Sequence, residues 1–124
     1  MRVCIVGCGA IGSLFAAHLA KLEDLEVWAY DLDERHVGAI RDNGLRLSGK
    51  SDVHSYPRAT TQAAEIPPCD FGIVATKSMH TRQAIEATAP IFRQGAVCSV
   101  QNGVGNEEII AEHVPRVIRG TTFP

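Results

Sequence analysis

Six residues near the N-terminus have the types and spacing of a loop that could hold a phosphate group. They are Gly7, Cys8, Gly9, Ala10, Ile11 and Gly12. In a GxGxxG loop the first glycine permits a tight turn, the second lets a pyrophosphate approach the backbone, and the third lets a helix pack closely against a strand. The pyrophosphate then lies at the start of that helix, where unpaired backbone N–H groups attract anions. We therefore predict that these six residues contact a dinucleotide; a glycine-rich turn without a ligand is the alternative.

An acidic residue stands where such a loop needs a partner for a ribose. Asp31 follows the apolar segment 25–30, roughly 20 residues after the loop, where the fingerprint places a carboxylate that accepts hydrogen bonds from ribose hydroxyls. A carboxylate there would repel a 2′-phosphate, which favours NAD over NADP. Asp31 could instead only cap the following loop, and Arg35 or His36 could meet a 2′-phosphate. Both NAD and NADP therefore remain candidate cofactors.

Two further polar side chains follow apolar segments. Lys77 comes soon after residues 71–75, and Asn102 soon after residues 96–100. Ligands of open parallel sheets bind beyond the carboxyl ends of the strands, so both side chains are candidates for the site. The ammonium group could contact a cofactor phosphate, a ribose or a substrate carboxylate, and the amide offers donors and an acceptor. Taken singly, the lysine is also typical of a protein surface, and the asparagine, with the glycine after it, is typical of a turn.

The elements that must position these residues alternate along the chain. Apolar runs predict strands over 3–6, 25–30, 45–47, 71–75, 96–100 and 117–118, with irregular short strands in 48–62. Residues at helical spacing predict helices over 11–22, 34–41, 81–92 and after Asn106, with Asp33 and Asn106 as N-caps. Strands that alternate with helices favour a parallel sheet covered on both faces. We predict a doubly wound, Rossmann-type α/β fold in a single domain over residues 1–124.

Two of these helices carry finer expectations. In the helix over 11–22, five apolar residues share one side and are expected to face the sheet: Ile11, Leu14, Phe15, Leu19 and Leu22. In the helix over 81–92, Pro90 is expected to disturb the last turn, because proline cannot continue the backbone hydrogen bonds.

The composition is that of an ordinary globular protein. Hydrophobic residues make up 45% of the chain and charged residues 21%, and the net charge is -2. This charge gives no reason to expect a nucleic-acid partner, and no apolar run is long enough for a membrane span. Cys4, Cys8, Cys69 and Cys98 have no metal-binding spacing, so we expect reduced, buried cysteines, no metal and a cytoplasmic protein. Cys8 could react with oxidants if the helix start lowers its pKa.

Taken together, these segments resemble one family, the 2-dehydropantoate 2-reductases, or ketopantoate reductases. The matching segments, in chain order, are residues 7–12, Asn43-Gly44-Leu45, Lys77, Gln101-Asn102-Gly103-Val104-Gly105 and Gly120-Thr121-Thr122. Many dehydrogenases share the glycine loop, so the resemblance depends mainly on the last two segments. Two positions depart from the family pattern. Asp31 stands where the family has a basic residue for the NADP 2′-phosphate, and Phe123 stands where many members have histidine.

The resemblance implies an activity, a cofactor and a missing part. Members reduce the ketone of 2-dehydropantoate to (R)-pantoate in pantothenate biosynthesis, usually with NADP. The residues matching Lys77 and Asn102 lie at the nicotinamide side of the cofactor. The asparagine also positions the 2-keto acid substrate, which makes Asn102 the candidate catalytic residue. The family's general acid is a lysine in a second, helical C-terminal domain, so we expect that these 124 residues are a truncated N-terminal half, inactive alone.

Other functions fit the same residues. Another NAD-dependent 2-keto or hydroxy-acid dehydrogenase would suit Asp31, and fold alone does not exclude it. A module that senses NAD(H) without catalysis fits if the polar residues after the strands are incidental. A bare sheet edge around Val104, Ile118 and Phe123 should expose apolar surface and favour self-association, which leaves a homodimer open.

Overall fold

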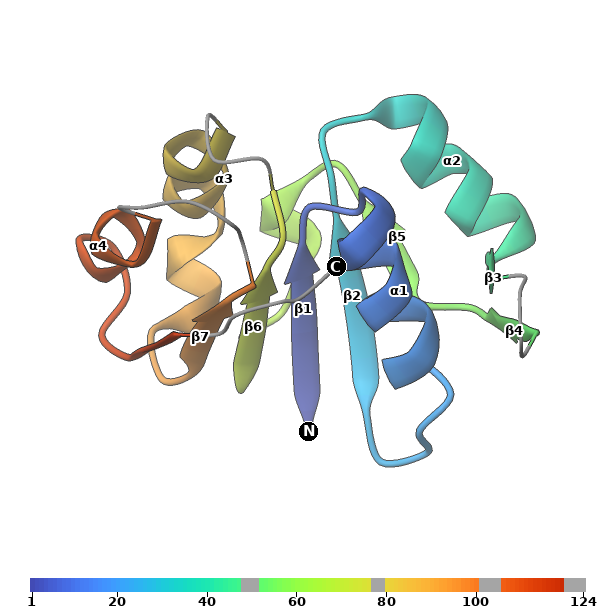
Figure 1. Ribbon diagram of the computed structural model, residues 1–124, viewed down its shortest axis with the longest axis horizontal. Helices are drawn as coiled ribbons and strands as arrows, with labels where there is room; N and C mark the ends of the chain where they lie inside the picture. The colour runs from blue at the N-terminus through green and yellow to red at the C-terminus, as the bar shows by residue number, and fades with distance from the viewer. Residues whose placement is uncertain (48–51, 77–79, 101–105, 120–124) are drawn as a thin grey trace.

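A parallel sheet runs through the part of the chain that the computed structural model describes, residues 1–47, 52–76, 80–100 and 106–119 (Figure 1). Its strands are Arg2–Val6 (β1), Glu26–Tyr30 (β2), Arg58–Thr60 (β5), Phe71–Val74 (β6), Ala96–Ser99 (β7) and Val117–Arg119 (β8). Within the described ranges these six strands lie in the order β5-β2-β1-β6-β7-β8, each parallel to its neighbour. The chain runs outward from β1 to β2 and β5, and then returns to add β6 beside β1. The order reverses at β1, and open sheets of this kind bind ligands beyond the strand ends at such a point.

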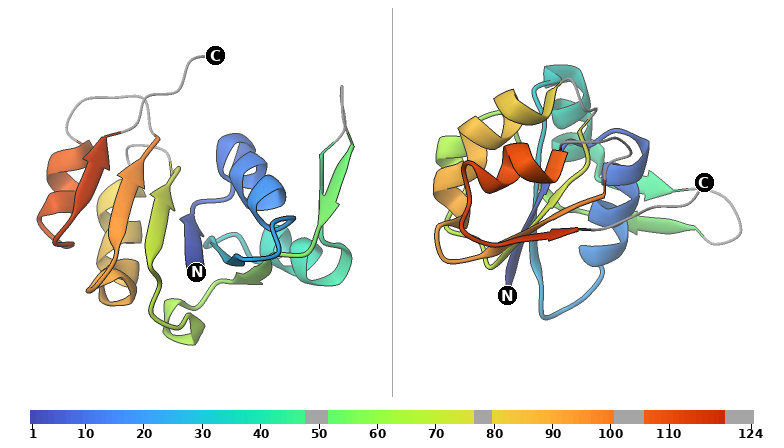
Figure 2. Two further views of the ribbon diagram at one scale, coloured as in Figure 1. Left: turned by 90° about the horizontal axis from the view of Figure 1, so that it is seen from below. Right: turned by 60° about the vertical axis from the view of Figure 1, so that its left-hand side comes forward.

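Helices cover both faces of the sheet. The α-helices are Ala10–Leu19 (α1), Glu34–Asn43 (α2), Thr81–Thr88 (α3) and Asn106–Ala111 (α4), and short 3₁₀ helices span Ala63–Glu65 and Ala89–Phe92. In the left view of Figure 2, α1 lies on one side of the strands and α3 and α4 lie on the other. This arrangement confirms the predicted doubly wound fold. None of the helices in the described ranges has both the length and the apolar character needed to span a membrane.

The central strand β1 is apolar because it faces two cores. Val3 and Ile5 belong to the cluster that includes residues of α1 and α2, whereas Cys4 and Val6 belong to the cluster that includes residues of α3 and α4. All four side chains are at most 3% exposed. Successive side chains of a strand point to opposite faces, so a strand that is covered on both sides reads as an unbroken apolar run. The glycine loop therefore starts from the most buried part of the sheet.

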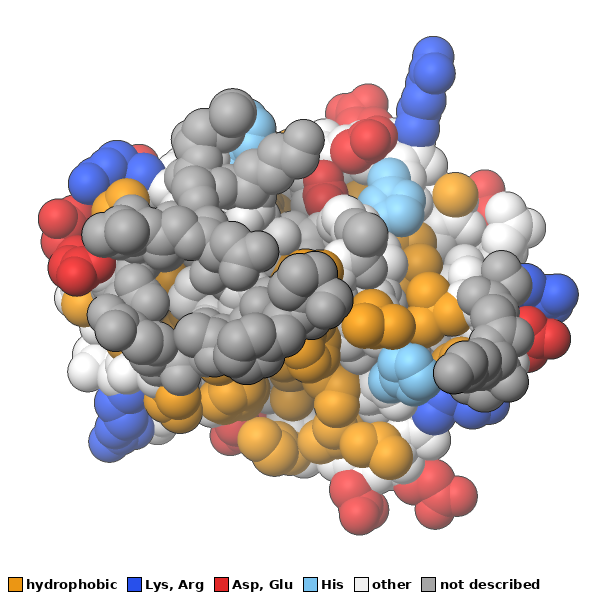
Figure 3. Space-filling view, viewed as in Figure 1, with side chains coloured by type: hydrophobic (Ala, Val, Ile, Leu, Met, Phe, Trp, Pro, Cys, Tyr) orange, Lys and Arg blue, Asp and Glu red, His pale blue; other side chains and the backbone are white. Residues whose placement is uncertain are grey.

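The face of α1 that meets the sheet matches the apolar spacing only in part, because Phe15 and Leu19 pack against the core as predicted. Ile11 is 38% exposed and Leu14 is 46% exposed, whereas Ala16 and Ala17 are fully buried. Figure 3 shows hydrophobic side chains at the surface along α1. The helix also ends before Leu22, which is 52% exposed. The two alanines are fully buried because α1 lies close to β1, and the larger Phe15 and Leu19 are only partly buried against the same cluster.

The segment after α2 contributes to two sheets. Leu45–Leu47 (β3) and Val53–Ser55 (β4) pair antiparallel in a small separate sheet. The Ser55 hydroxyl donates a hydrogen bond to the Ala17 carbonyl oxygen over 2.7 Å, which ties this sheet to α1. The strand β5 instead extends the main sheet, with Arg58 opposite Trp28 of β2. The predicted strand over 45–47 is confirmed, but the prediction of irregular strands afterwards misses the pairing of β5 with a distant segment.

Near the end of the described chain, two helix boundaries show how local residues act. The helix α3 gives way to a 3₁₀ helix that contains Pro90, as the proline predicts. The helix α4 begins at Asn106 itself, one residue earlier than an N-cap at that position would place it.

Ile118 of β8 is 49% exposed, in agreement with the predicted apolar edge. Val104 and Phe123, named for the same edge, lie outside the described residues.

Two glycines inside helices give a matched test of how closely α1 approaches β1. A Cβ at Gly12 would overlap the carbonyl oxygen of Gly7, whereas a Cβ at Gly38 in α2 would meet no atom within 4 Å. We expect Gly12→Ala to lower the free energy of unfolding by about 1–3 kcal/mol, the usual cost of overpacking. Gly38→Ala should raise it by about 0.5–1 kcal/mol, because alanine favours a helix more than glycine does. Urea denaturation measures both changes, and equal changes in the two variants would contradict the close approach.

Candidate dinucleotide-binding site

The glycine loop leaves β1 through a turn that few residues other than glycine adopt. Gly7 has a φ of 95°, and its N–H donates a hydrogen bond to the Tyr30 carbonyl oxygen over 2.8 Å. A Cβ on Gly7 would lie 2.7 Å from the Thr76 Cγ2 atom and 2.8 Å from the Thr76 backbone nitrogen. The loop is therefore held between the ends of β2 and β6, and both the turn and the close approach require glycine.

Gly9 leaves open space at the start of α1. It occupies the N-cap position with a φ of -70°, and no side chain caps the helix. A Cβ on Gly9 would meet no atom within 4 Å. The first backbone N–H groups of a helix have no partner within it, so the start of α1 beside Gly9 suits an anion. The loop has the geometry of the fingerprint, while the contact of its residues with a cofactor stays a prediction.

Asp31 ties the loop to the end of β2. Its Oδ2 atom accepts a hydrogen bond from the N–H of Cys8 over 2.7 Å, and its Oδ1 atom accepts one from the N–H of Asp33 over 2.9 Å. Asp33 in turn caps α2, as predicted, by accepting hydrogen bonds from the N–H groups of Arg35 and His36. The two carboxylates thus lie close together between the glycine loop and α2, and each is oriented by backbone donors.

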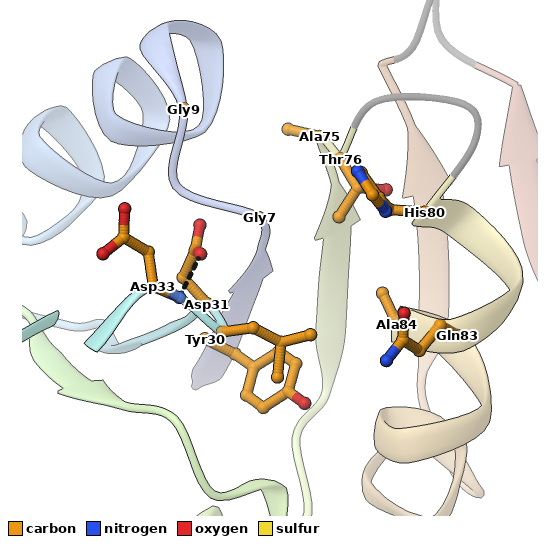
Figure 4. A pocket seen from close by; sticks show the side chains of 11 residues that line it. Gly7, Gly9, Tyr30, Asp31, Asp33, Ala75, Thr76, His80, Gln83 and Ala84 are labelled. Carbon is orange, nitrogen blue, oxygen red and sulfur yellow. Dashed lines mark hydrogen bonds between the residues drawn. The ribbon is translucent and has the colours of Figure 1, made fainter. Parts of the chain in front are cut away.

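A cavity of about 440 Å³ opens beyond the carboxyl ends of β1, β2 and β6 (Figure 4). Its lining residues are Gly7, Gly9, Tyr30, Asp31, Leu32, Asp33, Ala75, Thr76, His80, Gln83 and Ala84. Figure 4 shows the two carboxylates on one side and the residues of α3 on the opposite side. The volume is in the range of small-molecule sites. The cavity lies where the reversal of strand order predicts a ligand.

Part of this lining was not predicted from the sequence. Leu32, which is 55% exposed, follows the predicted Asp31, and Thr76 directly precedes Lys77. His80 and Gln83 come from the start of α3. The signal that could have found them is their position just after the apolar segment of β6. Which side chains of α3 face the cavity, however, depends on how that helix lies against the sheet.

Cys8 is a buried part of the loop and not a reactive thiol. It is 2% exposed, and burial together with the negative charge of Asp31 raises its pKa to about 12. The thiol therefore keeps its proton at neutral pH, which agrees with the expected reduced, buried cysteine and not with the alternative that the helix start lowers its pKa. The four cysteines are free, and Cys98 alone among them is not fully buried. In the described ranges, no three His, Cys, Asp or Glu side chains gather closely enough to hold a metal ion.

Lys77 and Asn102 lie outside the described residues, so their roles stay predictions. The strands that precede them are described. Thr76, which lies just beyond β6, lines the cavity, and β7 runs parallel to β6 and ends at the same edge of the sheet with the buried Val100 after it. The two strands that precede Lys77 and Asn102 in the sequence therefore end at the edge of the sheet where the cavity lies.

The reversed strand order, the parallel sheet and the glycine loop define a Rossmann-type α/β domain. The sequence matches the family described as "Ketopantoate reductase PanE/ApbA" over residues 3–123. A 2-dehydropantoate 2-reductase from Pyrococcus abyssi (strain GE5 / Orsay) is 40% identical over 123 residues, which are 98% of this chain and 40% of that relative. The chain belongs to the ketopantoate reductase family.

Solved structures share this fold. A PanE/ApbA family ketopantoate reductase from Ralstonia eutropha JMP134 superposes with a TM-score of 0.86 and 29% identity, over 96% of this chain and 40% of that one. A D-mandelate dehydrogenase solved with NADH and anilino(oxo)acetate superposes with a TM-score of 0.85 and 27% identity, over 98% of this chain and 40% of that one. The chain thus spans about two fifths of the length of the relatives that it matches.

Gly9→Val tests whether the loop receives a pyrophosphate. The open space and the φ at Gly9 let valine fit, so the free energy of unfolding should change by about 1 kcal/mol or less. The branched side chain would fill the space that a pyrophosphate needs, and the affinity for NADH and NADPH should fall by at least about tenfold. Fluorescence titration measures this affinity, with Gly38→Val as the control away from the loop. Parent-like affinity in Gly9→Val would contradict the assignment.

Proposed function

We propose that this chain binds NAD(P)H, with the pyrophosphate at residues 7–12 and the adenosine in the cavity beside Asp31. The observation that carries this proposal is the open space at Gly9, next to the uncapped start of α1 and at the point where the strand order reverses. A D-mandelate dehydrogenase of the same fold was solved with NADH, which supports the proposal.

The residues of the site fit the parts of such a cofactor. Each oxygen of the Asp31 carboxylate accepts one backbone hydrogen bond and keeps a further lone pair, which suits the hydroxyls of a ribose. Leu32 and Ala84 offer apolar surface in the same cavity for the flat face of a base. Lys77 would hold the cofactor by its charge, and Asn102 would orient the nicotinamide. When bound, the cofactor supplies a hydride.

The reaction that we propose for the complete protein is the reduction of a 2-keto acid, 2-dehydropantoate to (R)-pantoate. Membership of the family and a 40% identical 2-dehydropantoate 2-reductase support this substrate. Asn102 would hold the keto acid against the nicotinamide, where a fixed amide donor stabilises the developing alkoxide. The general acid would come from a helical C-terminal domain, in the three fifths of the relatives that this chain does not match.

A second candidate is an NADH-linked dehydrogenase for another 2-keto or 2-hydroxy acid. The observation that favours it is the pair of carboxylates, Asp31 and Asp33, at the position where the resemblance leads us to expect a basic residue. The similarity to a D-mandelate dehydrogenase solved with NADH points the same way. The two candidates differ in substrate and cofactor preference, and they share the site.

A chimeric protein tests the reaction. In it, the chain continues after Pro124 with the matching remainder of the Pyrococcus abyssi relative, and 2-dehydropantoate should cause loss of the absorbance of reduced nicotinamide. Asn102→Ala in the chimera should lower kcat/KM by about 10²–10³-fold, the usual effect of removing such a donor. The 124-residue chain alone should not turn over, because acid catalysis alone contributes about 10²–10⁴-fold.

Each other outcome of this experiment has a distinct meaning. Turnover of a different 2-keto acid would favour the second candidate. Tight cofactor binding by the chimera without turnover of any 2-keto acid would favour an NAD(H)-sensing module. Turnover by the 124-residue chain at the rate of the chimera would show that the catalytic groups lie within it.

The two carboxylates predict a preference for NADH. Asp31→Ser should shift the ratio of the two affinities toward NADPH by about 1–2 kcal/mol, and it should also weaken both, because the N–H of Cys8 loses its acceptor. Asp33→Ser keeps an N-cap for α2 and should shift the ratio in the same direction without that loss. Asp42→Ser, at the other end of α2, is the control. Titrations with NADH and NADPH that give the parent ratio in both variants would show that neither carboxylate faces the ribose.

A further inference from the structure

A second cavity adjoins the first, between α1 and α2. It has a volume of about 460 Å³, and its lining residues are Cys8, Gly9, Ser13, Asp31, Asp33 and His36. It shares Gly9, Asp31 and Asp33 with the first cavity. Figure 3 shows acidic and histidine side chains next to one another where α1 and α2 begin. A dinucleotide with its pyrophosphate at Gly9 and a ribose at Asp31 would therefore have this second cavity beside that ribose.

A serine and a histidine meet in this cavity. The Ser13 hydroxyl donates a hydrogen bond to the Cys8 carbonyl oxygen over 2.8 Å, and its oxygen lies 3.4 Å from the Nε2 atom of His36. Because the Ser13 hydroxyl already donates its proton to the Cys8 carbonyl oxygen, the Ser13 oxygen can only accept a hydrogen bond from the His36 ring. This favours a histidine ring that carries a proton on Nε2, and the contact holds the ring at the cavity.

Charged side chains line the cavity together with His36. In the described part of the chain, the titratable side chains that line it with His36 are Asp31 at the end of β2, Asp33 before α2 and Cys8 in the loop. The Cys8 thiol keeps its proton, because its pKa is about 12. From α1, Ser13 contributes no charge. With a neutral histidine the cavity therefore carries two negative charges, and with a protonated histidine it also holds a positive one.

The charged side chains that precede His36 on α2 lie outside this cavity. Glu34 and Arg35 are exposed, and neither lines the cavity. The sequence leaves Arg35 and His36 as alternatives for contact with a 2′-phosphate. Of the two, the histidine lines the cavity that Asp31 also lines, and the arginine does not.

We propose that His36 is a specificity-determining residue that makes the acceptance of a 2′-phosphate depend on pH, an inference that rests on the proposed binding of NAD(P)H. A neutral imidazole leaves the two carboxylates to repel the phosphate, so the chain binds NADH in preference. An imidazolium donates a charge-assisted hydrogen bond to the phosphate and admits NADPH. Histidine is the side chain that changes charge near neutral pH. NADH has no 2′-phosphate, so its affinity should change little.

Fluorescence titration of the 124-residue chain with NADH and with NADPH, at about pH 6 and about pH 8, tests this role. Relative to NADH, NADPH should bind at least about fivefold better at the lower pH. The 2′-phosphate itself titrates, with a second pKa of about 6, and this alone makes the ratio of NADPH to NADH affinity depend on pH. In His36→Gln only that contribution to the pH dependence should remain. His36→Arg carries a permanent charge and should bind NADPH with little dependence on pH beyond that part.

Arg35→Gln is the matched control, because it removes an exposed charge of the same helix outside the cavity, and it should keep the pH dependence of the parent. A ratio of affinities that does not change with pH in the parent, or a full pH dependence in His36→Gln, would overturn the role of His36 and leave NAD(P)H binding intact. Failure of the parent to bind either cofactor would overturn the proposed function, and this inference with it.

Discussion

Contact between the backbones of Gly12 and Gly7 sets the distance between α1 and β1, and the rest of the site depends on that distance. A side chain at Gly12 would overlap the Gly7 carbonyl group, so the start of the helix can lie directly beyond the end of β1 only with glycine there. The small side chains of Ala16 and Ala17 continue the contact along the helix. As a result, the N–H groups at the start of α1 lie at the reversal of the strand order, where an anion gains most from them.

Asp31 extends this arrangement to the next strand. Its carboxylate bonds to the N–H of Cys8, so the position of the glycine loop and the position of the negative charge depend on each other. The same carboxylate lines both cavities, one toward α3 and one toward His36. A residue that would read the ribose is thus also a structural support of the loop. Under the proposed function, a change at this residue would alter both the cofactor preference and the geometry of the loop.

The part of the site that could be predicted from the sequence rests on local backbone requirements. Gly7 needs a positive φ to turn, and Asp33 precedes a helix whose first N–H groups need an acceptor, so residue type and position suffice for both. His80 and Gln83 could not be predicted in the same way. They reach the cavity because of the angle at which α3 lies against the sheet, and that angle depends on packing between segments that are distant in the chain.

The sequence alone determined the order of strands and helices along the chain, the glycine loop and the acidic residue after β2. Each of these features depends on residues a few positions apart. Tertiary structure alone decided which side chains of α1 are fully buried, since the apolar spacing predicts burial of Ile11 and Leu14, whereas the close approach to β1 buries Ala16 and Ala17. It also decided that β5 completes the edge of the main sheet. Finally, it placed His36 but not Arg35 in the lining of the cavity that Asp31 also lines. These features depend on distances between remote segments, and such distances are set only when the whole sheet and its helices pack together.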